Sequence, residues 1–389
     1  MTKENVRKSI PFNKPYLQGR ELLYIAEAVA SGKISGDGLF TKKCSDFFRE
    51  RFGFRQPLLT TSCTDALEMA ALLLDISEGD EVILPSYTFV STANAFVLRG
   101  AKLVFADSES AHPNIDAALI EPLISSKTKA IVVVHYAGVA CDMKAIGELG
   151  SRYGIAIVED AAQAIDSYFD GRPLGTFGAL AAFSFHETKN VISGEGGLLC
   201  VNDDALSLRA EIIREKGTNR AAFFRGEIDK YGWVDIGSSF LPSDIIAAYL
   251  YAQLEQLDEI QRRRKEIWES YRRLLEPVAT EHRLFSIPAI PRYATNNGHM
   301  FYLVCQSADV RARLIAHLKE HGIHAVFHYL SLHKSSFYAA KHDGRELPNA
   351  DRFSDCLVRL PLYFELIDSQ IAAISDAIHR FCLHDSERK

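Results

Sequence analysis

Short apolar runs alternate with amphipathic segments through the middle of the chain. The runs at 58–60, 82–84, 103–105, 130–134 and 155–158 predict strands, and the segments at 64–74, 89–99, 116–125 and 143–153 have the periodicity of helices. The apolar runs do not alternate with polar residues, which is typical of strands that helices cover on both faces. This order predicts an α/β architecture with a largely parallel sheet, in which ligands bind at the carboxyl ends of the strands.

The regions on either side carry different patterns. Residues 1–16 predict a polar arm, 22–29 a helix that ends at Gly32, and 31–40 a loop, after which a phenylalanine-rich helix ends at Gly53. Later helices are predicted at 204–216 and from 243 through 264, with a polar, aromatic and basic loop at 217–237 between them. From about residue 258, strands at 300–304 and 325–327 flank a helix at 309–321. We therefore expect a large domain at 1–257 and a smaller α+β domain at 258–389.

Composition narrows the class of protein. Of the 389 residues, 47% are hydrophobic and 24% are charged, and the net charge is −6, which argues against a general nucleic-acid or membrane-surface binder. No apolar run approaches the roughly 20 residues that span a bilayer, and residues 1–10 lack the apolar core of a secretory signal. The seven cysteines form no C-x-x-C pair, which indicates free thiols and no zinc site. We expect a cytoplasmic protein.

One lysine lies in a constrained position between two predicted strands. The stretch from Phe183 to Asn190 alternates apolar residues, reaches Lys189, and continues through a glycine-rich step at 194–197 into the apolar run 198–201. A lysine held in such a loop is positioned and partly desolvated, and desolvation lowers its pKa and makes its amine a nucleophile. We hypothesise that Lys189 forms a Schiff base with pyridoxal phosphate.

Three polar features follow predicted strands, and each also has an ordinary structural explanation. The turn Thr61-Ser62-Cys63-Thr64 opens a helix and offers a phosphate site, although one of its hydroxyls can simply cap the helix. In Glu159-Asp160-Ala161-Ala162-Gln163, a carboxylate at the strand end can pair with a pyridinium nitrogen and Gln163 can reach a ring hydroxyl, although an acidic helix cap is a common alternative. In Pro85-Ser86-Tyr87-Thr88-Phe89, an aromatic ring can stack on a cofactor or pack in the core.

Other motifs are incomplete. His186-Glu187 begins like the H-E-x-x-H zinc motif, but position 190 is Asn, so we expect no metal there. The glycines at 194–197 precede a strand and therefore do not form a dinucleotide fingerprint. Basic and aromatic residues alternate between Arg214 and Trp233, which indicates either a solvated face or a site for a diphosphate with an attached ring.

In their order and spacing, these motifs resemble those of the DegT/DnrJ/EryC1/StrS family of PLP-dependent sugar aminotransferases. The resemblance extends from Pro11-Phe12 to Leu360-Pro361-Leu362. Within the family, it is closest to the transaminases that make dTDP-4-amino-4,6-dideoxygalactose, and it is carried by the stretches 35–38, 60–74, 79–102, 135–141, 158–163, 183–190 and 211–220. It implies fold type I, with a mostly parallel seven-stranded sheet in the large domain, and a homodimer with shared active sites.

The resemblance also implies roles for individual residues. Lys189 would hold the cofactor and move the proton, Asp160 would pair with the pyridine nitrogen, Gln163 with the ring hydroxyl, and Phe89 would stack on the ring. The phosphate would be bound by Cys63, Thr64 and Ser184, and by Ser239 in place of an asparagine that many relatives use across the subunit boundary. The substrate residues would be His186, Arg220, Tyr329 and His333.

The implied reaction transfers the amino group of L-glutamate to dTDP-4-keto-6-deoxy-D-glucose, giving dTDP-4-amino-4,6-dideoxy-D-galactose and 2-oxoglutarate. The product suggests a role in lipopolysaccharide or enterobacterial common antigen synthesis. Alternatives are a sibling transaminase that aminates C3 or gives the gluco epimer at C4, a PLP-dependent sugar dehydratase, and a non-catalytic protein that binds sugar nucleotides. The dehydratase subgroup has histidine in place of the lysine, so Lys189 argues against it.

Overall fold

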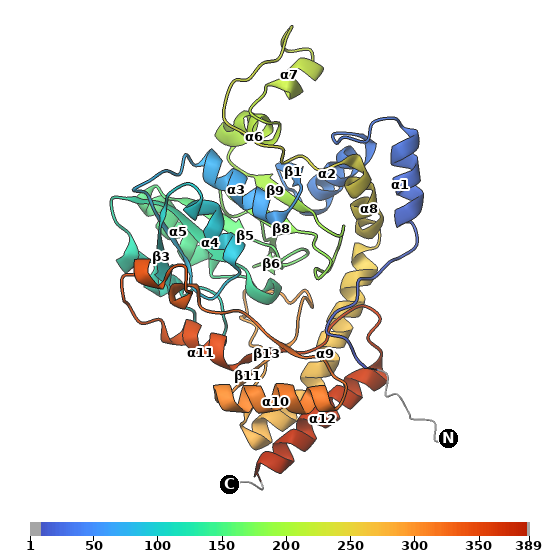
Figure 1. Cartoon of the computed structure of the whole chain (residues 1–389), viewed down its shortest axis with the longest axis vertical. Helices are drawn as coiled ribbons and strands as arrows, with labels where there is room; N and C mark the ends of the chain where they lie inside the picture. The colour runs from blue at the N-terminus through green and yellow to red at the C-terminus, as the bar shows by residue number, and fades with distance from the viewer. Residues whose placement is uncertain (1–8, 387–389) are drawn as a thin grey trace.

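The computed structural model describes residues 9–386 and contains a large twisted sheet with a smaller sheet below it (Figure 1). The first half of the predicted N-terminal arm, residues 1–8, and residues 387–389 lie outside the described part. The large sheet has seven strands in the order β1-β9-β8-β5-β4-β2-β3. They are β1 (Gln56–Thr60), β2 (Glu81–Pro85), β3 (Lys102–Ala106), β4 (Thr128–Val134), β5 (Ala156–Asp160), β8 (Leu180–Ser184) and β9 (Gly197–Val201). Only β9 runs antiparallel to its neighbours, so the largely parallel sheet is confirmed.

Helices cover both faces of this sheet, which explains why the central residues of the strands are apolar. Along β4, Ala130 and Val132 face one layer of the core and Ile131 and Val133 face the other. One layer contains α3 (Cys63–Leu73), α4 (Val90–Val97) and α6 (Ser207–Arg214). The other contains α1 (Glu21–Ala30), α2 (Leu39–Phe52), α5 (Met143–Tyr153) and α8 (Asp244–Leu254). Successive side chains of a strand point to opposite faces, so both faces of β4 are buried from residue 130 onward.

Three predicted helices are wrong in extent. Residues 116–125 form only two 3₁₀ turns, η1 (Ala117–Leu119) and η2 (Glu121–Leu123), because Pro122 has no N–H to donate to a longer helix. The segment 204–216 is a 3₁₀ turn, η4 (Asp204–Leu206), followed by α6. The long helix predicted from 243 divides at Gln256, whose φ of −107° and ψ of 12° end α8 before α9 (Leu257–His282) begins.

The smaller sheet has four antiparallel strands in the order β10-β11-β13-β12. They are β10 (Phe285–Ser286), β11 (Tyr302–Cys305), β12 (Val326–Phe327) and β13 (Leu357–Arg359), packed with α9, α10 (Ala308–Glu320), α11 (Pro348–Cys356) and α12 (Asp368–Ser386). A further two-stranded ribbon consists of β6 (Tyr168–Phe169) and β7 (Arg172–Pro173). The boundary between the domains at 257/258 stays a prediction.

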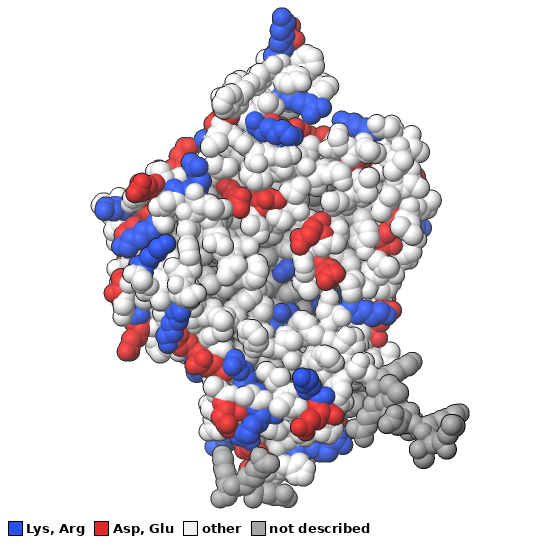
Figure 2. All heavy atoms as spheres, viewed as in Figure 1, with Lys and Arg blue, Asp and Glu red and all other residues white. Residues whose placement is uncertain are grey.

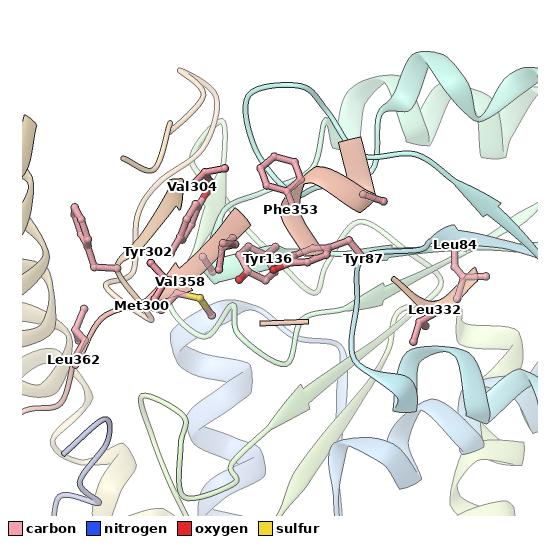
Figure 3. Close-up of a cluster of buried hydrophobic side chains, with 14 of the residues drawn as sticks. Leu84, Tyr87, Tyr136, Met300, Tyr302, Val304, Leu332, Phe353, Val358 and Leu362 are labelled. Carbon is pink, nitrogen blue, oxygen red and sulfur yellow. The ribbon is translucent and has the colours of Figure 1, made fainter. Parts of the chain in front are cut away.

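The two sheets are joined by a continuous apolar core and by a helix cap. Tyr87 and Tyr136, from loops after two strands of the large sheet, lie beside Val358 of β13 and below Phe353 of α11 (Figure 3). Asp107, just after β3, accepts hydrogen bonds from the backbone N–H groups of residues 349 and 350 at 3.1 and 2.7 Å, and thereby caps α11. These contacts bring the small sheet against the carboxyl ends of the large one.

The surface is mixed in charge. Lys and Arg alternate with Asp and Glu over the face shown in Figure 2, and neither sign forms a continuous field. Within residues 9–386, no helix is both long enough and apolar enough to cross a membrane. The loop 217–237, which contains the short helix α7 (Arg220–Phe224), projects from the top of the molecule (Figure 1).

Candidate active site

A cavity of about 940 Å³ opens where the carboxyl ends of the parallel strands meet the small sheet. Its lining comes from segments far apart in the sequence. The turn after β1 contributes residues 62–64, the end of β5 contributes Asp160, and the loop after β8 contributes Lys189. Residues 327–332 and Arg359 also line this cavity. The topology therefore brings most of the residues predicted from the sequence together in one place.

Lys189 lies in a short turn that is hydrogen bonded on both sides. Its backbone N–H donates to the carbonyl of His186 at 2.9 Å, and its neighbour Asn190 is buried. The Asn190 amide donates to the Gln261 side chain at 2.8 Å and to the Asn297 carbonyl at 3.0 Å. Burial lowers the pKa of the Lys189 amine, while Cys63 and Asp160 partly oppose that shift. A positioned amine with a lowered pKa is the property expected of a nucleophilic lysine.

Asp160 is buried at the end of β5, and within residues 9–386 its carboxylate accepts hydrogen bonds from two neutral donors. Thr92 donates to one carboxylate oxygen at 2.6 Å and the N–H of Ala162 donates to the other at 3.1 Å. Burial raises the pKa of Asp160, and these hydrogen bonds reduce that rise without removing it. A cationic N–H donor would complete the environment of this carboxylate.

Gln163 is also at the cavity, but other groups of the chain use both ends of its amide. Its oxygen accepts from the N–H of Ala137 at 2.6 Å, and its nitrogen donates to the Tyr329 hydroxyl at 3.1 Å. The predicted contact of Gln163 with the hydroxyl of the cofactor ring would therefore lie beside the hydroxyl of Tyr329. Tyr329 itself lines the cavity, as the sequence-based assignment of a substrate residue requires.

The turn before α3, at residues 62–64, forms a cup at the N-terminus of that helix. Ser62 caps the helix by accepting from the N–H of Asp65 at 3.0 Å, and the Thr64 hydroxyl lies 2.8 Å from that of Ser91. Exposed N–H groups and the helix dipole favour a phosphate here. Gly197 of β9 lies against this turn so closely that a Cβ would be 2.3 Å from the carbonyl carbon of Ser62. Cys63 and Ser184, which are also predicted to hold the phosphate, line the cavity beside this turn.

Behind the site, Glu159 organises the backbone. It is fully buried and accepts hydrogen bonds from the N–H groups of Gly175, Phe177 and Gly178 at 2.7–2.8 Å and from His135 at 3.0 Å. Burial alone would raise the pKa of Glu159, but the hydrogen bonds from His135 and the backbone outweigh it and lower the pKa. Since Glu159 precedes Asp160 on the strand, this network holds the position of Asp160.

The remaining predicted residues divide into two groups. Phe89 lines the cavity and is 54% exposed, with its ring 5.9 Å from that of Tyr329, and His186 lines it while contacting Thr188 at 2.9 Å. His333 is buried outside the lining, with its ring 2.7 Å from the Ser86 hydroxyl.

Ser239 and Arg220 also lie outside the cavity lining in this chain. Ser239 pairs with Glu215 in an isolated bridge, and Arg220 lies 3.7 Å from the same glutamate. Their assigned roles stay predictions.

Sequence reasoning missed several residues of this site. Thr92 and Asn190 carry no motif of their own. The fold alone brings Thr92 to Asp160 and Asn190 to the carbonyl of Asn297. Arg359 also lines the cavity. The sequence feature that could have indicated it is its charge within the apolar run that ends in Leu360-Pro361-Leu362.

The donors of the cavity fit pyridoxal phosphate. The group needs an amine near its aldehyde, a carboxylate near its pyridine nitrogen and an anion site for its phosphate. Lys189, Asp160 and the cup at residues 62–64 supply these, and the carboxylate lacks the cationic donor that the pyridinium would provide. A flat aromatic side chain, Phe89, is also available for the ring.

Comparisons with known proteins identify the family of this chain. The profile of the DegT/DnrJ/EryC1/StrS aminotransferase family matches residues 15–379. The aminotransferase TlmJ from Streptoalloteichus hindustanus is 32% identical, with a TM-score of 0.88 and coverage of 97% of this chain and 100% of that one. A 3-amino-5-hydroxybenzoic acid synthase is 25% identical, with a TM-score of 0.86 over 97% and 100% of the chains. The PLP form of Spr1654 from Streptococcus pneumoniae shares the fold at 24% identity, with a TM-score of 0.87 over 97% and 99%. The chain therefore belongs to the DegT/DnrJ/EryC1/StrS aminotransferase family, fold type I enzymes whose cofactor is pyridoxal phosphate.

Proposed function

We propose that this enzyme transfers the amino group of L-glutamate to dTDP-4-keto-6-deoxy-D-glucose, giving dTDP-4-amino-4,6-dideoxy-D-galactose and 2-oxoglutarate. The observation that carries the transaminase chemistry is the juxtaposition of Lys189, with its lowered pKa, and the buried Asp160 in one cavity beside a phosphate cup. The identity of the sugar is supported by the sequence motifs that resemble those of the transaminases making this product.

Pyridoxal phosphate, when bound, supplies a reactive aldehyde and an electron sink for the transfer of the amino group. The residues of this chain would bind, orient and move protons. The cup at 62–64 would hold the phosphate, and the carboxylate of Asp160 would hold a proton on the pyridine nitrogen, which in turn favours the ionised carboxylate. The Lys189 amine, once released from the cofactor, would take a proton from the donor carbon and return it elsewhere as a general base and acid.

The exposed edge of the molecule supports a homodimer as part of this proposal. In the projecting loop 217–237, Trp233 is 85% exposed, Phe224 68% and Val234 54%. Clustered large apolar side chains at a surface are typical of an interface. Ser239 and Arg220 lie in or beside this loop, so the proposed dimer would turn them toward a neighbouring active site. Sedimentation equilibrium at several concentrations tests this, and a monomer at micromolar protein would contradict it.

The product decides the specific reaction. The holoenzyme is incubated with dTDP-4-keto-6-deoxyglucose and ¹⁵N-labelled L-glutamate, and the nucleotide sugar is analysed by NMR. We expect the label on C4 in the axial orientation. An amine at C3, or an equatorial amine at C4, would refute this product and indicate a sibling transaminase. An unlabelled, deoxygenated sugar would indicate a dehydratase.

Two variants separate the chemistry from the fold. Lys189→Ala should lose the long-wavelength absorption band of the bound cofactor that responds to glutamate, and should lose turnover. Lys127→Ala, which replaces an exposed lysine away from the cavity, should retain both. A Lys189→Ala protein that completes repeated turnovers would refute the role of this lysine.

A further inference from the structure

Two long helices beside the small sheet bring together three side chains that can bind a metal ion. Figure 1 shows α9 and α12 side by side at the lower end of the molecule, where they pack against each other. His282 is the last residue of α9, and the centre of its ring lies 5.5 Å from that of His379 of α12. Glu281, His282 and His379 each offer one ligand atom, and these atoms lie within 4.8 Å of one another.

The polar atoms of this cluster have no partner in the chain. Apart from the contact between the two rings, the side chains of Glu281, His282 and His379 form no hydrogen bond or ion pair with any residue from 9 to 386. The Nε2 atom of His282 is also buried, so water does not satisfy it. A buried polar atom without a partner costs stability, and a ligand bound between the three side chains would remove that cost.

The chemistry of the three groups favours a divalent transition-metal ion as this ligand. Two imidazoles and one carboxylate are a donor set of known zinc sites, whereas Mg²⁺ prefers oxygen ligands alone. The position at the end of α9 adds to this preference, because the last carbonyl groups and the dipole of a helix favour a positive charge there. The carboxylate of Glu281 contributes a full negative charge, so the site suits a cation.

The separations are close to those that one ion requires. With bonds of about 2.0–2.2 Å, two ligand atoms of a tetrahedral zinc ion lie about 3.4 Å apart. Atoms that lie within 4.8 Å of one another therefore need to approach by at most about 1.4 Å. Glu281 is exposed and the two histidines are only partly buried, so rotation of the side chains can provide this movement without shifting either helix. Water would complete the fourth position.

We propose that Glu281, His282 and His379 form a binding site for a divalent transition-metal ion such as Zn²⁺, and that the bound ion clamps the end of α9 to α12. None of the three residues lines the active-site cavity, so the ion would stabilise the fold and take no part in the transfer of the amino group. The three ligands come together only when the two helices pack, so binding of the ion favours the folded chain. This proposal does not depend on the identity of the sugar substrate.

Calorimetric titration of Zn²⁺ into chelator-treated holoenzyme tests the site in solution. His282→Asn and His379→Asn should each weaken zinc binding at least about tenfold, because even partners outside the ligand shell contribute about 10–100-fold to metal affinity. His324→Asn, which replaces an exposed histidine outside the cluster, should leave the affinity unchanged. Mg²⁺ should not bind detectably at this site, and the absorption band of the cofactor should not change when Zn²⁺ is added.

Two further measurements locate the ion and follow the clamp. Zn²⁺ should raise the midpoint of thermal unfolding of the wild type but not that of His379→Asn, whose midpoint without zinc shows whether this variant folds. In crystals of the zinc-loaded holoenzyme, the anomalous signal at the zinc edge should lie about 2.0–2.2 Å from one atom of each of the three side chains.

Three results would overturn the proposal. The first is zinc binding that is equally tight in the wild type and in both histidine variants. The second is an anomalous signal that lies only at other residues, which remains decisive even if the variants do not fold. The third is binding that requires millimolar Zn²⁺, which would indicate an adventitious ion only.

Discussion

Replacing Gly197 by alanine should damage the phosphate cup through backbone contact alone. A Cβ at this position would lie 2.3 Å from the carbonyl carbon and oxygen of Ser62 and 2.5 Å from the amide nitrogen of Cys63, about 1 Å closer than an ordinary contact. Gly197 pairs with Thr60 on one side of β9 and Ser184 on the other. The strand therefore cannot move away without breaking ladder hydrogen bonds.

The magnitude follows from this double constraint. Overpacking typically costs about 1–3 kcal/mol, and the upper end applies here because the colliding atoms are backbone. Moving the turn by a few tenths of an ångström would also misalign the N–H groups that face the phosphate. Loss of one hydrogen bond to a charged group costs about 1.5–3 kcal/mol, so we expect Gly197→Ala to bind pyridoxal phosphate at least about tenfold more weakly.

Two measurements with a matched control check this reasoning. Urea denaturation of the apoprotein gives the loss of stability, and titration with pyridoxal phosphate followed by absorbance gives the change in affinity. Gly147 lies within α5, and a Cβ added there would meet no atom within 4 Å, so Gly147→Ala should be neutral or stabilise by about 0.5–1 kcal/mol. A Gly197→Ala protein with wild-type stability and cofactor affinity would refute the proposed geometry of the cup.

Three further substitutions probe the groups around the cofactor. Lys189→Ala should lower the rate of proton transfer at least about 10³-fold in single-turnover experiments with L-glutamate, and rescue by added methylamine would separate lost chemistry from lost structure. Asn190→Ala removes hydrogen bonds to Gln261 and to the Asn297 carbonyl. Because Lys189 then loses its orientation, kcat should fall by a larger factor than KM rises. An unchanged kcat would contradict this. Glu159→Gln leaves buried N–H groups poorly paired and should destabilise by about 2–4 kcal/mol at neutral pH. Because the folded-state pKa of Glu159 is lowered, its stabilisation is present above the ordinary glutamate pKa of about 4.3 and is lost as pH falls through the lower folded-state pKa. The urea midpoint of the wild type should therefore fall more steeply below about pH 4.3 than that of Glu159→Gln, and parallel curves would contradict the assigned pKa shift.

The order of strands and helices was largely predictable because it depends on local patterns. Runs such as Ala130 to Val134 are short and wholly apolar, and helices such as α5 end at a glycine, Gly154, that adopts the left-handed conformation with φ of 66°. Errors occurred where a local feature opposed the periodicity. Pro122 reduced one predicted helix to 3₁₀ turns, and a non-helical residue at Gln256 divided another.

The site was predictable only for residues that carry a motif. Lys189, Asp160 and the turn at 62–64 each follow a strand, and parallel strands bring their carboxyl ends to one edge, so their convergence in one cavity follows from the fold class. His333 was assigned to the substrate by the family resemblance, yet its ring is buried against Ser86 outside the cavity lining. A motif places a residue along the chain but does not say which way its side chain points.

What the sequence by itself determined was therefore the α/β architecture, the family and the positions of Lys189 and Asp160, because these depend on periodicity and on short spacings along the chain. Only the tertiary structure decided that Thr92 holds Asp160, that Asn190 ties the lysine loop to Asn297, and that Arg359 lines the cavity. Such contacts join residues tens to hundreds of positions apart, and their energies depend on burial and orientation, which exist only after the two sheets have packed together.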